Sequence, residues 1–485
     1  MKRYFIKTFW CAMNQADSEK INMIMLQSWF MRAMKWEDAD LVIFNTCSVR
    51  QKWEDRVFGF VEEIYKENNN RLENNKSNLI KVWITWCMVR KTWLDWKYLE
   101  WYKRDKNKSK KITLVTEKNQ IFNNDDKLFP RNNWKIDFVL RIEDTKFLPL
   151  MLTHIYWEKI GNEDKFDDYL KSKQLRESPH SATIIIQTWC DNYCTFCIVP
   201  YTRWMENSRP IDDIVNEAKD AVNNWAKEIT LVWQNVNSYW KQFVDKKFWN
   251  KEKWKWNDWL WKSPFRQLLE ELDKIDWLDR IRFTSSNPHD MTQDILDAHF
   301  DLEKTCNYLH FALQSWNNDI LKRMNRKHSY DDFKKQVDYL RSRDPNFSIS
   351  TDIIVGFSWE TEEMFNDTVK AFEECEFDFT YNARYSVRKW TIAAKMFPDD
   401  ISDEEKADRW HTLNEKLFES VSKRNKNMIW NIEEILVSWE KDWRKFWRTR
   451  NFKEVFFDWE SVNIWDIVNV KITDLDRYVL NWTLV

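Results

Sequence analysis

Residues 187–210 read QTWCDNYCTFCIVPYTRWMENSRP, and this stretch guides the interpretation of the whole chain. It contains Cys190, Cys194 and Cys197 in a CxxxCxxC array. The run before it, residues 182–187 (ATIIIQ), is apolar and β-branched, which predicts a buried strand. The cysteines therefore follow the C-terminal end of a strand, which is the edge at which α/β folds bind ligands.

Three thiolates on a short loop can hold three irons of a [4Fe–4S] cube and leave the fourth iron open to a small molecule. A closed electron-transfer cluster would need a fourth cysteine nearby, and structural zinc would need two separated pairs, neither of which accompanies the array. Three buried structural thiols are the remaining alternative. The array resembles the signature of the radical S-adenosylmethionine (SAM) enzymes. This resemblance implies that the open iron takes the amino and carboxylate groups of SAM.

The composition bounds the class of protein. A length of 485 residues predicts two to four domains with ample core. The net charge of -2 gives no global sign of nucleic-acid binding, so local patches must bind any RNA. Eight cysteines, most of them in motifs, indicate a reducing cytoplasm and metal ligation. We find neither a signal peptide nor an apolar stretch of about 18 residues, and we therefore expect a cytoplasmic protein without a membrane partner.

The glycine and tryptophan contents are abnormal. The chain has 3 Gly and 33 Trp in 485 residues, whereas an ordinary chain carries about 7% Gly. The two residue types together make up about the ordinary glycine share, and many Trp stand where turns belong. Trp cannot cheaply adopt the positive φ that turns and helix ends need. We therefore hypothesise that most Trp represent glycines, encoded by UGA codons that the organism reads as glycine. A truly Trp-rich protein is the alternative.

The first segment, residues 1–156, repeats one pattern, a predicted strand followed by a cysteine. In a parallel α/β sheet the C-terminal strand ends share one edge, so these cysteines could meet there and hold a second cluster. Three unrelated core cysteines are the alternative. The strands are expected at residues 4–9, 41–44 and 81–85, and the cysteines are Cys11, Cys47 and Cys87.

The second segment, residues 176–415, again alternates predicted strands and helices, as in a (β/α)6 partial TIM barrel. Polar residues follow several of the strands, where a barrel places its active site. From the resemblance to radical SAM enzymes, four of them are candidates for binding SAM, and turn capping is the alternative for each. They are Gln234, Ser286, Gln314 and Asp352. We expect His310 to be structural, and Cys306 and Cys375 to be core thiols.

The last segment, residues 422–485, changes to short β-like runs separated by turn signals, which predicts a small OB-like barrel. It resembles a TRAM domain, an RNA-binding module. A concentrated basic patch can neutralise phosphates although the segment is nearly neutral. Arg203 and Arg209, beyond the cysteine array, are candidates for contact with substrate phosphate or cofactor, with ion pairs as the alternative. The patch comprises Lys441, Arg444, Lys445, Arg448 and Arg450.

Three strings around Cys11, Cys47 and Cys87 resemble the N-terminal domain of the methylthiotransferases once Trp is read as Gly. They are TFWCAMNQADSEK, FNTCSVRQKWEDRVFG and ITWCMVRKTW. The strings NTCSVR, CIVPYTRWMENSRP and LVWQNVNSYW are most similar to the subgroup that acts on N6-dimethylallyladenosine in tRNA. The resemblance covers nearly the whole chain.

The resemblance implies a tRNA-modifying enzyme with two [4Fe–4S] clusters that uses two SAM molecules, one as methyl donor and one as radical source. It also implies an electron donor such as flavodoxin or ferredoxin, and a monomer. Three alternatives stay open. The same chemistry could act on threonylcarbamoyl-adenosine in tRNA or on a ribosomal protein, the clusters could be structural in an RNA-binding protein, or the chain could be a zinc-binding interaction protein.

Overall fold

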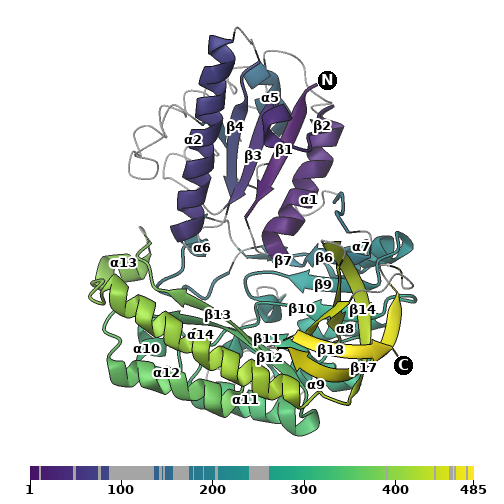
Figure 1. Ribbon diagram of the computed structural model, residues 1–485, viewed down its shortest axis with the longest axis vertical. Coiled ribbons are helices and arrows are strands. Elements are labelled where there is room, and N and C mark those ends of the chain that lie inside the picture. The colour runs from purple at the N-terminus through teal and green to yellow at the C-terminus, as the bar shows by residue number, and fades with distance from the viewer. Residues whose placement is uncertain are drawn as a thin grey trace. The chain divides into compact units, whose positions relative to one another are not determined.

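The computed structural model divides into two compact units, Met1–Glu177 with Cys197–Trp204, and Ser178–Phe196 with Met205–Val485. The expected fold class is confirmed, because both units have parallel sheets with helices and the C-terminal strands close a small barrel (Figure 1). The structure describes residues 1–9, 12–46, 51–74, 78–86, 136–140, 142, 145, 148–156, 174–178, 180–188, 190–202, 206–239, 262–388, 391–441, 444–457, 463, 466–476 and 479–484.

The first unit contains a five-stranded parallel sheet in the order β2-β1-β3-β4-β5. The three strands predicted to precede cysteines are neighbours at its centre and run in the same direction. The strands are β1 (Arg3–Thr8), β2 (Met31–Arg32), β3 (Leu41–Thr46), β4 (Lys81–Trp86) and β5 (Phe138–Val139). The helices are α1 (Ala12–Gln27), α2 (Gln51–Glu73), α5 (Leu148–Tyr156) and the 3-10 turn η1 (Trp36–Asp38).

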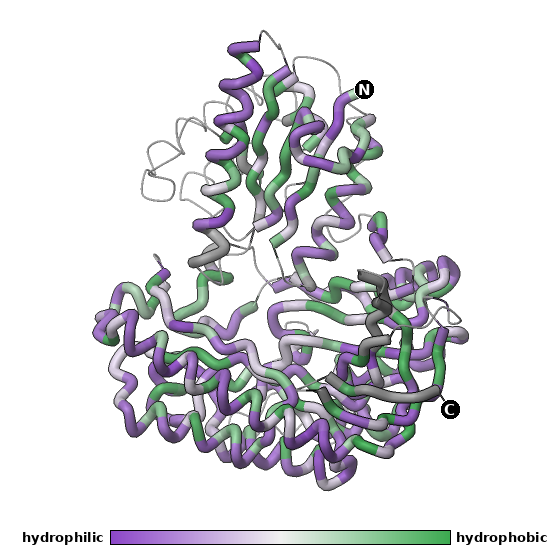
Figure 2. Tube along the Cα trace, viewed as in Figure 1, coloured by the Kyte–Doolittle hydropathy of each residue, from purple (hydrophilic) through white to green (hydrophobic). Residues whose placement is uncertain are grey.

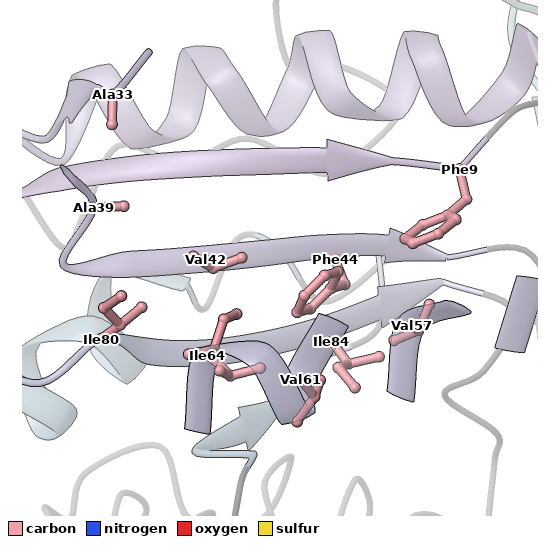
Figure 3. Close-up of a cluster of buried hydrophobic side chains, with 11 residues drawn as sticks. Phe9, Ala33, Ala39, Val42, Phe44, Val57, Val61, Ile64, Ile80 and Ile84 are labelled. Atoms are coloured by element: carbon pink, nitrogen blue, oxygen red, sulfur yellow. The ribbon is translucent and has the colours of Figure 1, made fainter. Parts of the chain in front are cut away.

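Helix α2 packs on one face of this sheet through an apolar stripe. Val57, Val61 and Ile64 recur at helical spacing and are buried, so they present one side of α2 to the strands. They pack on Val42 and Phe44 of β3, whose side chains point to the same face because residues two apart in a strand do so (Figure 3). Figure 2 shows the central strands of this unit as largely hydrophobic.

The second unit contains six parallel strands that follow one another in the order β6-β9-β10-β11-β12-β13. They form two three-stranded sheets, and a parallel bridge between Ser286 and Phe311 joins β10 to β11. A helix or helix pair connects each strand to the next, which matches the predicted (β/α)6 partial barrel. The strands are β6 (Ser181–Ile185), β9 (Glu228–Val232), β10 (Arg280–Phe283), β11 (Tyr308–His310), β12 (Ser348–Val355) and β13 (Phe379–Arg384).

Helices of this unit pack against its parallel strands. Among them, α14 runs through residues 416–421, the interval that we expected to separate the last two segments. The helices are α7 (Ile211–Asn223), α8 (Pro264–Asp273), α9 (Gln293–Asp301), α10 (Asn318–Arg323), α11 (Tyr330–Arg343), α12 (Glu362–Cys375), α13 (Ile392–Met396) and α14 (Asp403–Lys426). Shorter elements are η3 (Val236–Ser238), η6 (Pro288–Asp290) and the two-stranded ribbon of β7 (Gln187–Thr188) and β8 (Asn207–Ser208); α6 (Val199–Thr202) belongs to the first unit.

The last strands form a closed barrel in the order β14-β15-β16-β18-β17, and β17 pairs back onto β14. Closure leaves no free edge strand, which suits a small all-β module. Its core is apolar and includes Ile435, Val437, Val455 and Val470. The strands are β14 (Ile432–Lys441), β15 (Arg444–Thr449), β16 (Glu454–Phe457), β17 (Ile467–Asp476) and β18 (Val479–Leu484).

The end of β15 and the turn that follows it, residues 448–453, dock this barrel onto the parallel strands, and we call this segment the docking loop. Arg280 and Arg282 of β10 are almost fully buried and point at it. Arg280 donates to the carbonyl of Arg448 at 2.7 Å, and Arg282 donates to the carbonyls of Thr449 and Arg450 at 2.9 and 2.7 Å. Charged donors therefore satisfy the buried backbone of the docking loop.

Side chains of the docking loop also reach Tyr308 of β11 and Asp378, the residue before β13. The ring of Phe452 stacks on Tyr308 with centroids 4.4 Å apart. Lys453 Nζ lies 2.5 Å from Asp378 Oδ1, and Arg424 donates to the same carboxylate at 3.2 Å. Burial alone would raise the pKa of Asp378, but the charges of Lys453 and Arg424 outweigh it and hold the pKa below its ordinary value. Asp378 is therefore a buried carboxylate that stays ionised.

Several tryptophans occupy backbone conformations that suit glycine. Five of the eleven non-glycine residues with positive φ in the described part of the chain are Trp. At the end of α7, Trp225 has φ 76°, with Trp225 N–H donating to the Val222 carbonyl and Ala226 N–H to the Ala221 carbonyl. This is a Schellman motif, in which the residue at the Trp225 position is usually Gly. The geometry supports the hypothesis that such Trp represent glycines.

Candidate active site

The cysteine array lies on the loop that leaves β7, at the C-terminal side of the parallel strands. Cys190, Cys194 and Cys197 are partly exposed, and none of them forms a disulfide bond. Tyr193, between the first two, has a left-handed backbone with φ 48°. Such strain in a bulky residue persists only where neighbouring contacts hold it, and it is frequent at functional sites.

The end of α10 supplies those contacts. Thr195 N–H donates to the Met324 carbonyl at 3.0 Å, and Thr195 Oγ1 donates to the Arg323 carbonyl at 2.7 Å. Asn325 Nδ2 donates to the Tyr193 carbonyl at 3.0 Å. These bonds satisfy loop backbone groups that strand pairing leaves open, so α10 fixes the path of the loop.

Two side chains point N–H groups at cysteine sulfur. Asn192 Nδ2 lies 3.5 Å from Cys190 Sγ, and Arg326 Nη1 lies 3.4 Å from Cys194 Sγ. Donors facing sulfur stabilise the thiolate form, which is the form that binds metal. The donor set therefore fits an iron–sulfur cluster better than inert core thiols. Cys306 and Cys375 contrast with it because both are buried, and burial raises the pKa of Cys375 far above its ordinary value.

A network of amides joins the ribbon β7–β8 to the ends of β9 and β10. Gln187 Nε2 donates to the Asn235 carbonyl at 2.8 Å, and Asn235 Nδ2 donates to Asp290 at 2.6 Å. Asn237 and Asn287 bond reciprocally, with Asn237 Nδ2 to the Asn287 carbonyl at 2.8 Å and Asn287 N–H to Asn237 Oδ1 at 2.9 Å. Tertiary structure thus connects polar residues that sequence reasoning placed only on separate strand ends.

Of the four residues predicted to bind SAM, Gln234, Ser286 and Gln314 follow the C-terminal ends of β9, β10 and β11, whereas Asp352 lies inside β12. Gln314 has φ 77°, and its N–H donates to the Asp352 carbonyl at 2.8 Å, so these two are neighbours. Asp352 is 38% exposed at the side chain. Ser286 is fully buried, and its Oγ has no hydrogen-bond partner among the described residues. Gln234 is half-buried after β9.

His310 is oriented by its neighbours on both ring nitrogens. Ser285 N–H lies 3.2 Å from Nδ1, which therefore accepts, and Nε2 lies 3.5 Å from Asp352 Oδ2. The ring also contacts Tyr381 of β13, with centroids 5.6 Å apart. A histidine with partners on several strands agrees with the structural role that we expected.

Of the two arginines beyond the cysteine array, the structure describes only Arg209. Arg209 is buried, pairs with Glu217 at 2.6 Å and donates to the Ile185 carbonyl at 2.8 Å. Its guanidinium therefore ties α7 to β6, as the ion-pair alternative anticipates. Arg203 lies outside the described residues.

The predicted basic patch lies on β14 and β15, except for Arg450, which directly follows β15. In the backbone register, Lys441 lies opposite Arg444, and Lys445 lies opposite Glu440. The side chains of two further members of the patch, Arg448 and Arg450, contact other residues. Arg448 lies 4.4 Å from the Phe452 ring centroid. Arg450 donates to the Thr305 carbonyl at 3.3 Å and to the Glu303 carbonyl, so it contributes to docking.

The three cysteines of the first unit, Cys11, Cys47 and Cys87, lie outside the described residues. The strands before them are described, and their ends are adjacent. Thr46 of β3 and Trp86 of β4 are direct register partners, and Thr8 of β1 pairs with Asn45 of β3. The shared edge expected from the strand-and-cysteine pattern is therefore present.

A six-stranded parallel partial barrel with a CxxxCxxC loop at its C-terminal edge defines the core of a radical SAM enzyme. The family model "Radical SAM superfamily" matches residues 184–372, and "Uncharacterized protein family UPF0004" matches residues 3–97. Among solved structures, the chain is similar to a radical S-adenosylmethionine methyltransferase, TsrM, from Kitasatospora setae. The TM-score is 0.49 and the identity 11%, over 81% of this chain and 77% of that chain.

Similarity to curated proteins extends over the full length. The chain is 34% identical to the tRNA-2-methylthio-N(6)-dimethylallyladenosine synthase of Clostridium novyi, over 100% of this chain and 97% of the relative. It is 33% identical to the enzyme of the same name from Alkaliphilus oremlandii, over 100% of this chain and 93% of the relative. The chain therefore belongs to the tRNA-2-methylthio-N(6)-dimethylallyladenosine synthase family. Membership of the radical SAM superfamily implies SAM and [4Fe–4S] clusters as cofactors.

Proposed function

We propose that this chain methylthiolates C2 of N6-dimethylallyladenosine beside the anticodon of tRNA. The observation that carries the proposal is the CxxxCxxC loop at the strand ends of a partial barrel, in a chain related over its full length to enzymes of that name. The hydrogen at an aromatic carbon is not acidic, so acid–base side chains cannot remove it, and a radical can. An anticodon-loop base can leave its stack at little cost to enter a pocket.

Cys190, Cys194 and Cys197 would hold the cluster that binds SAM. Asn192 and Arg326 support this role through the N–H groups that they direct at two of the sulfurs. A cluster bound there supplies the electron that cleaves SAM. The protein's task is to hold cofactor and substrate in register and to exclude water.

Residues at the strand ends would orient the SAM molecule. Asp352 and Gln314 are neighbours, and a half-exposed carboxylate is suited to accept hydrogen bonds from ribose hydroxyls. The buried Ser286 Oγ would gain a partner from a polar group of SAM, which would remove the cost of leaving it unsatisfied. Gln234 completes this proposed set.

Cys11, Cys47 and Cys87 would hold a second cluster, which would supply the sulfur. The adjacency of the ends of β1, β3 and β4 supports this assignment, since each of these strands leads to one of the cysteines. The polar start of α1 is hydrogen-bonded to the C-terminal ends of β1 and β3. Asn14 Nδ2 donates to the carbonyls of Phe9 and Thr46 at 2.6 and 3.2 Å.

The proposed division of labour follows the segments. Residues 1–156 would carry the second cluster, 176–415 the SAM chemistry and 422–485 the binding of tRNA, through the members of the basic patch other than Arg450. Arg203 would contribute contacts beside the cysteine array, whereas the guanidinium of Arg209 is used in the ion pair with Glu217. We further propose a cytoplasmic monomer that takes electrons from a flavodoxin or ferredoxin. No helix in the part of the chain that the structure describes is both long and apolar enough to cross a bilayer.

Cysteine variants test the assignment. Changing Cys194 to Ala should abolish reductive cleavage of SAM to 5′-deoxyadenosine, whereas changing Cys47 to Ala should preserve this cleavage and stop methylthiolation. Both products are quantified by mass spectrometry after incubation with prenylated tRNA and dithionite. Retained methylthiolation in the Cys47 variant would refute the second cluster. Modification of threonylcarbamoyl-adenosine or of a ribosomal protein instead would favour the alternative substrates.

A further inference from the structure

The turn that ends α10 holds Arg326 in a defined position. Asn325 has φ 56° and occupies the left-handed position of a Schellman motif, which Asn tolerates better than most residues. Its N–H donates to the Lys322 carbonyl at 2.9 Å, and Arg326 N–H donates to the Leu321 carbonyl at 2.8 Å. Two backbone hydrogen bonds therefore fix the direction in which the Arg326 side chain leaves the helix.

The guanidinium of Arg326 joins three groups. Nη1 lies 3.4 Å from Cys194 Sγ, and Nη2 donates to the Ala312 carbonyl at 2.6 Å and to Asn287 Oδ1 at 3.2 Å. Ala312 follows β11 and Asn287 follows β10. The rigid, planar fork of arginine thus connects the cysteine loop to two strand ends, which a single ammonium could not do with the same geometry.

The contact with Cys194 has an electronic consequence. Reduction of a [4Fe–4S] cluster from the 2+ to the 1+ state adds one electron without breaking a bond, and the added negative charge spreads onto the sulfur ligands. N–H donors and positive charge next to sulfur stabilise the reduced state more than the oxidised state, and so raise the reduction potential.

We propose that Arg326 is a positioning residue that orients the Cys194 thiolate and raises the reduction potential of the cluster on the cysteine loop. The inference rests on the proposed function only in requiring a cluster on Cys190, Cys194 and Cys197. Asn192, whose amide is 3.5 Å from Cys190 Sγ, contributes in the same direction. Its effect is smaller because the amide is neutral.

The test compares Arg326→Gln, Arg326→Lys and the control Lys327→Gln. Lys327 is exposed and adjacent in the chain, so its substitution removes one positive charge without removing the bond to sulfur. Each reconstituted protein is analysed for iron and sulfide, and its potential is measured by dithionite titration followed by electron paramagnetic resonance. We expect Arg326→Gln to lower the reduction equilibrium constant about tenfold, a shift of about 59 mV for one electron. Arg326→Lys should shift less, and the control should match the wild type.

The outcomes separate this inference from the proposed function. A wild-type protein without a cluster would contradict the proposed function. A wild-type cluster whose potential is unchanged in Arg326→Gln, at equal iron content, would overturn the role of Arg326. Loss of the cluster from both Arg326 variants would also overturn the electronic part, because Arg326 would then serve the loop only as a structural support.

Discussion

Replacing Trp225 by glycine should stabilise the protein, and this prediction tests the idea that many Trp represent glycines. Trp225 follows α7 in a Schellman motif with φ 76°, and the residue is 74% exposed. Trp29 occupies the same kind of position after α1, with φ 63° and 55% exposure. Trp29 N–H donates to the Leu26 carbonyl and Phe30 N–H to the Met25 carbonyl, which completes the motif there.

The expected magnitude follows from the backbone conformation. A left-handed conformation costs a residue with a Cβ about 1–2 kcal/mol, and glycine avoids this cost. Glycine also loses more entropy on folding, which offsets roughly half of the gain. The indole of Trp225 is mostly in water, so its removal sacrifices little buried area. We therefore expect about 1 kcal/mol of added stability for each of Trp225→Gly and Trp29→Gly, additive in the double variant.

Urea unfolding measures the effect, and Trp410→Gly is the matched control. Trp410 lies inside α14, where its Nε1 donates to the Asn382 carbonyl at 2.9 Å. Glycine there should destabilise by about 2 kcal/mol or more, through lost helix propensity and a lost hydrogen bond. If Trp225→Gly destabilised the protein as Trp410→Gly does, the reasoning from φ would be wrong. Mass spectrometry of the native protein should find glycine at residue 225.

Three further outcomes are expected. Lys453→Met should destabilise the second unit by about 3 kcal/mol in urea unfolding, because it removes the buried cationic partner of Asp378. The control Glu271→Gln removes an exposed ion pair and should change the free energy of unfolding by less than about 0.5 kcal/mol. Burial lowers the pKa of His299 to about 4, whereas the same group in the unfolded chain has a pKa of about 6.5, so between these two pH values the unfolded chain binds one more proton than the folded protein. The free energy of unfolding should therefore fall by about 3 kcal/mol as the pH drops through this window, and His299→Phe should reduce this dependence of stability on pH. Deleting residues 430–485 should lower the thermal midpoint in the absence of tRNA, because the deletion removes the docking loop; an unchanged midpoint would mean that the last barrel is an independent module.

Short local patterns of apolar residues in the sequence were sufficient to predict several strands of the fold. The expected strands at residues 41–44 and 81–85 lie within β3 and β4, because buried parallel strands read as short continuous apolar or β-branched runs. The strand-and-cysteine repeat predicted that three strand ends share an edge, and β1, β3 and β4 are adjacent and parallel. The methylthiotransferase resemblance, carried by short strings around cysteines, predicted the family that full-length similarity confirms.

Residues whose roles depend on distant partners could not be predicted in this way. The sixth strand of the predicted (β/α)6 barrel, β13, could not be located from the sequence, because its residues, FTYNAR, alternate aromatic and polar types without an apolar run. Arg450 was expected to contact RNA, yet its guanidinium reaches carbonyls of the segment before β11. Arg326 was not singled out, since its sulfur partner lies 132 residues earlier in the chain.

The sequence by itself determined which residues can bind iron and where strands begin, since both are properties of a few neighbouring side chains. Only the tertiary structure decided which charged groups are used to hold the protein together. Arg280, Arg282 and Asp378 are buried because the docking loop covers them, and their charges are tolerated because it supplies carbonyls and an ammonium as partners. Such compensation requires segments that meet only after folding.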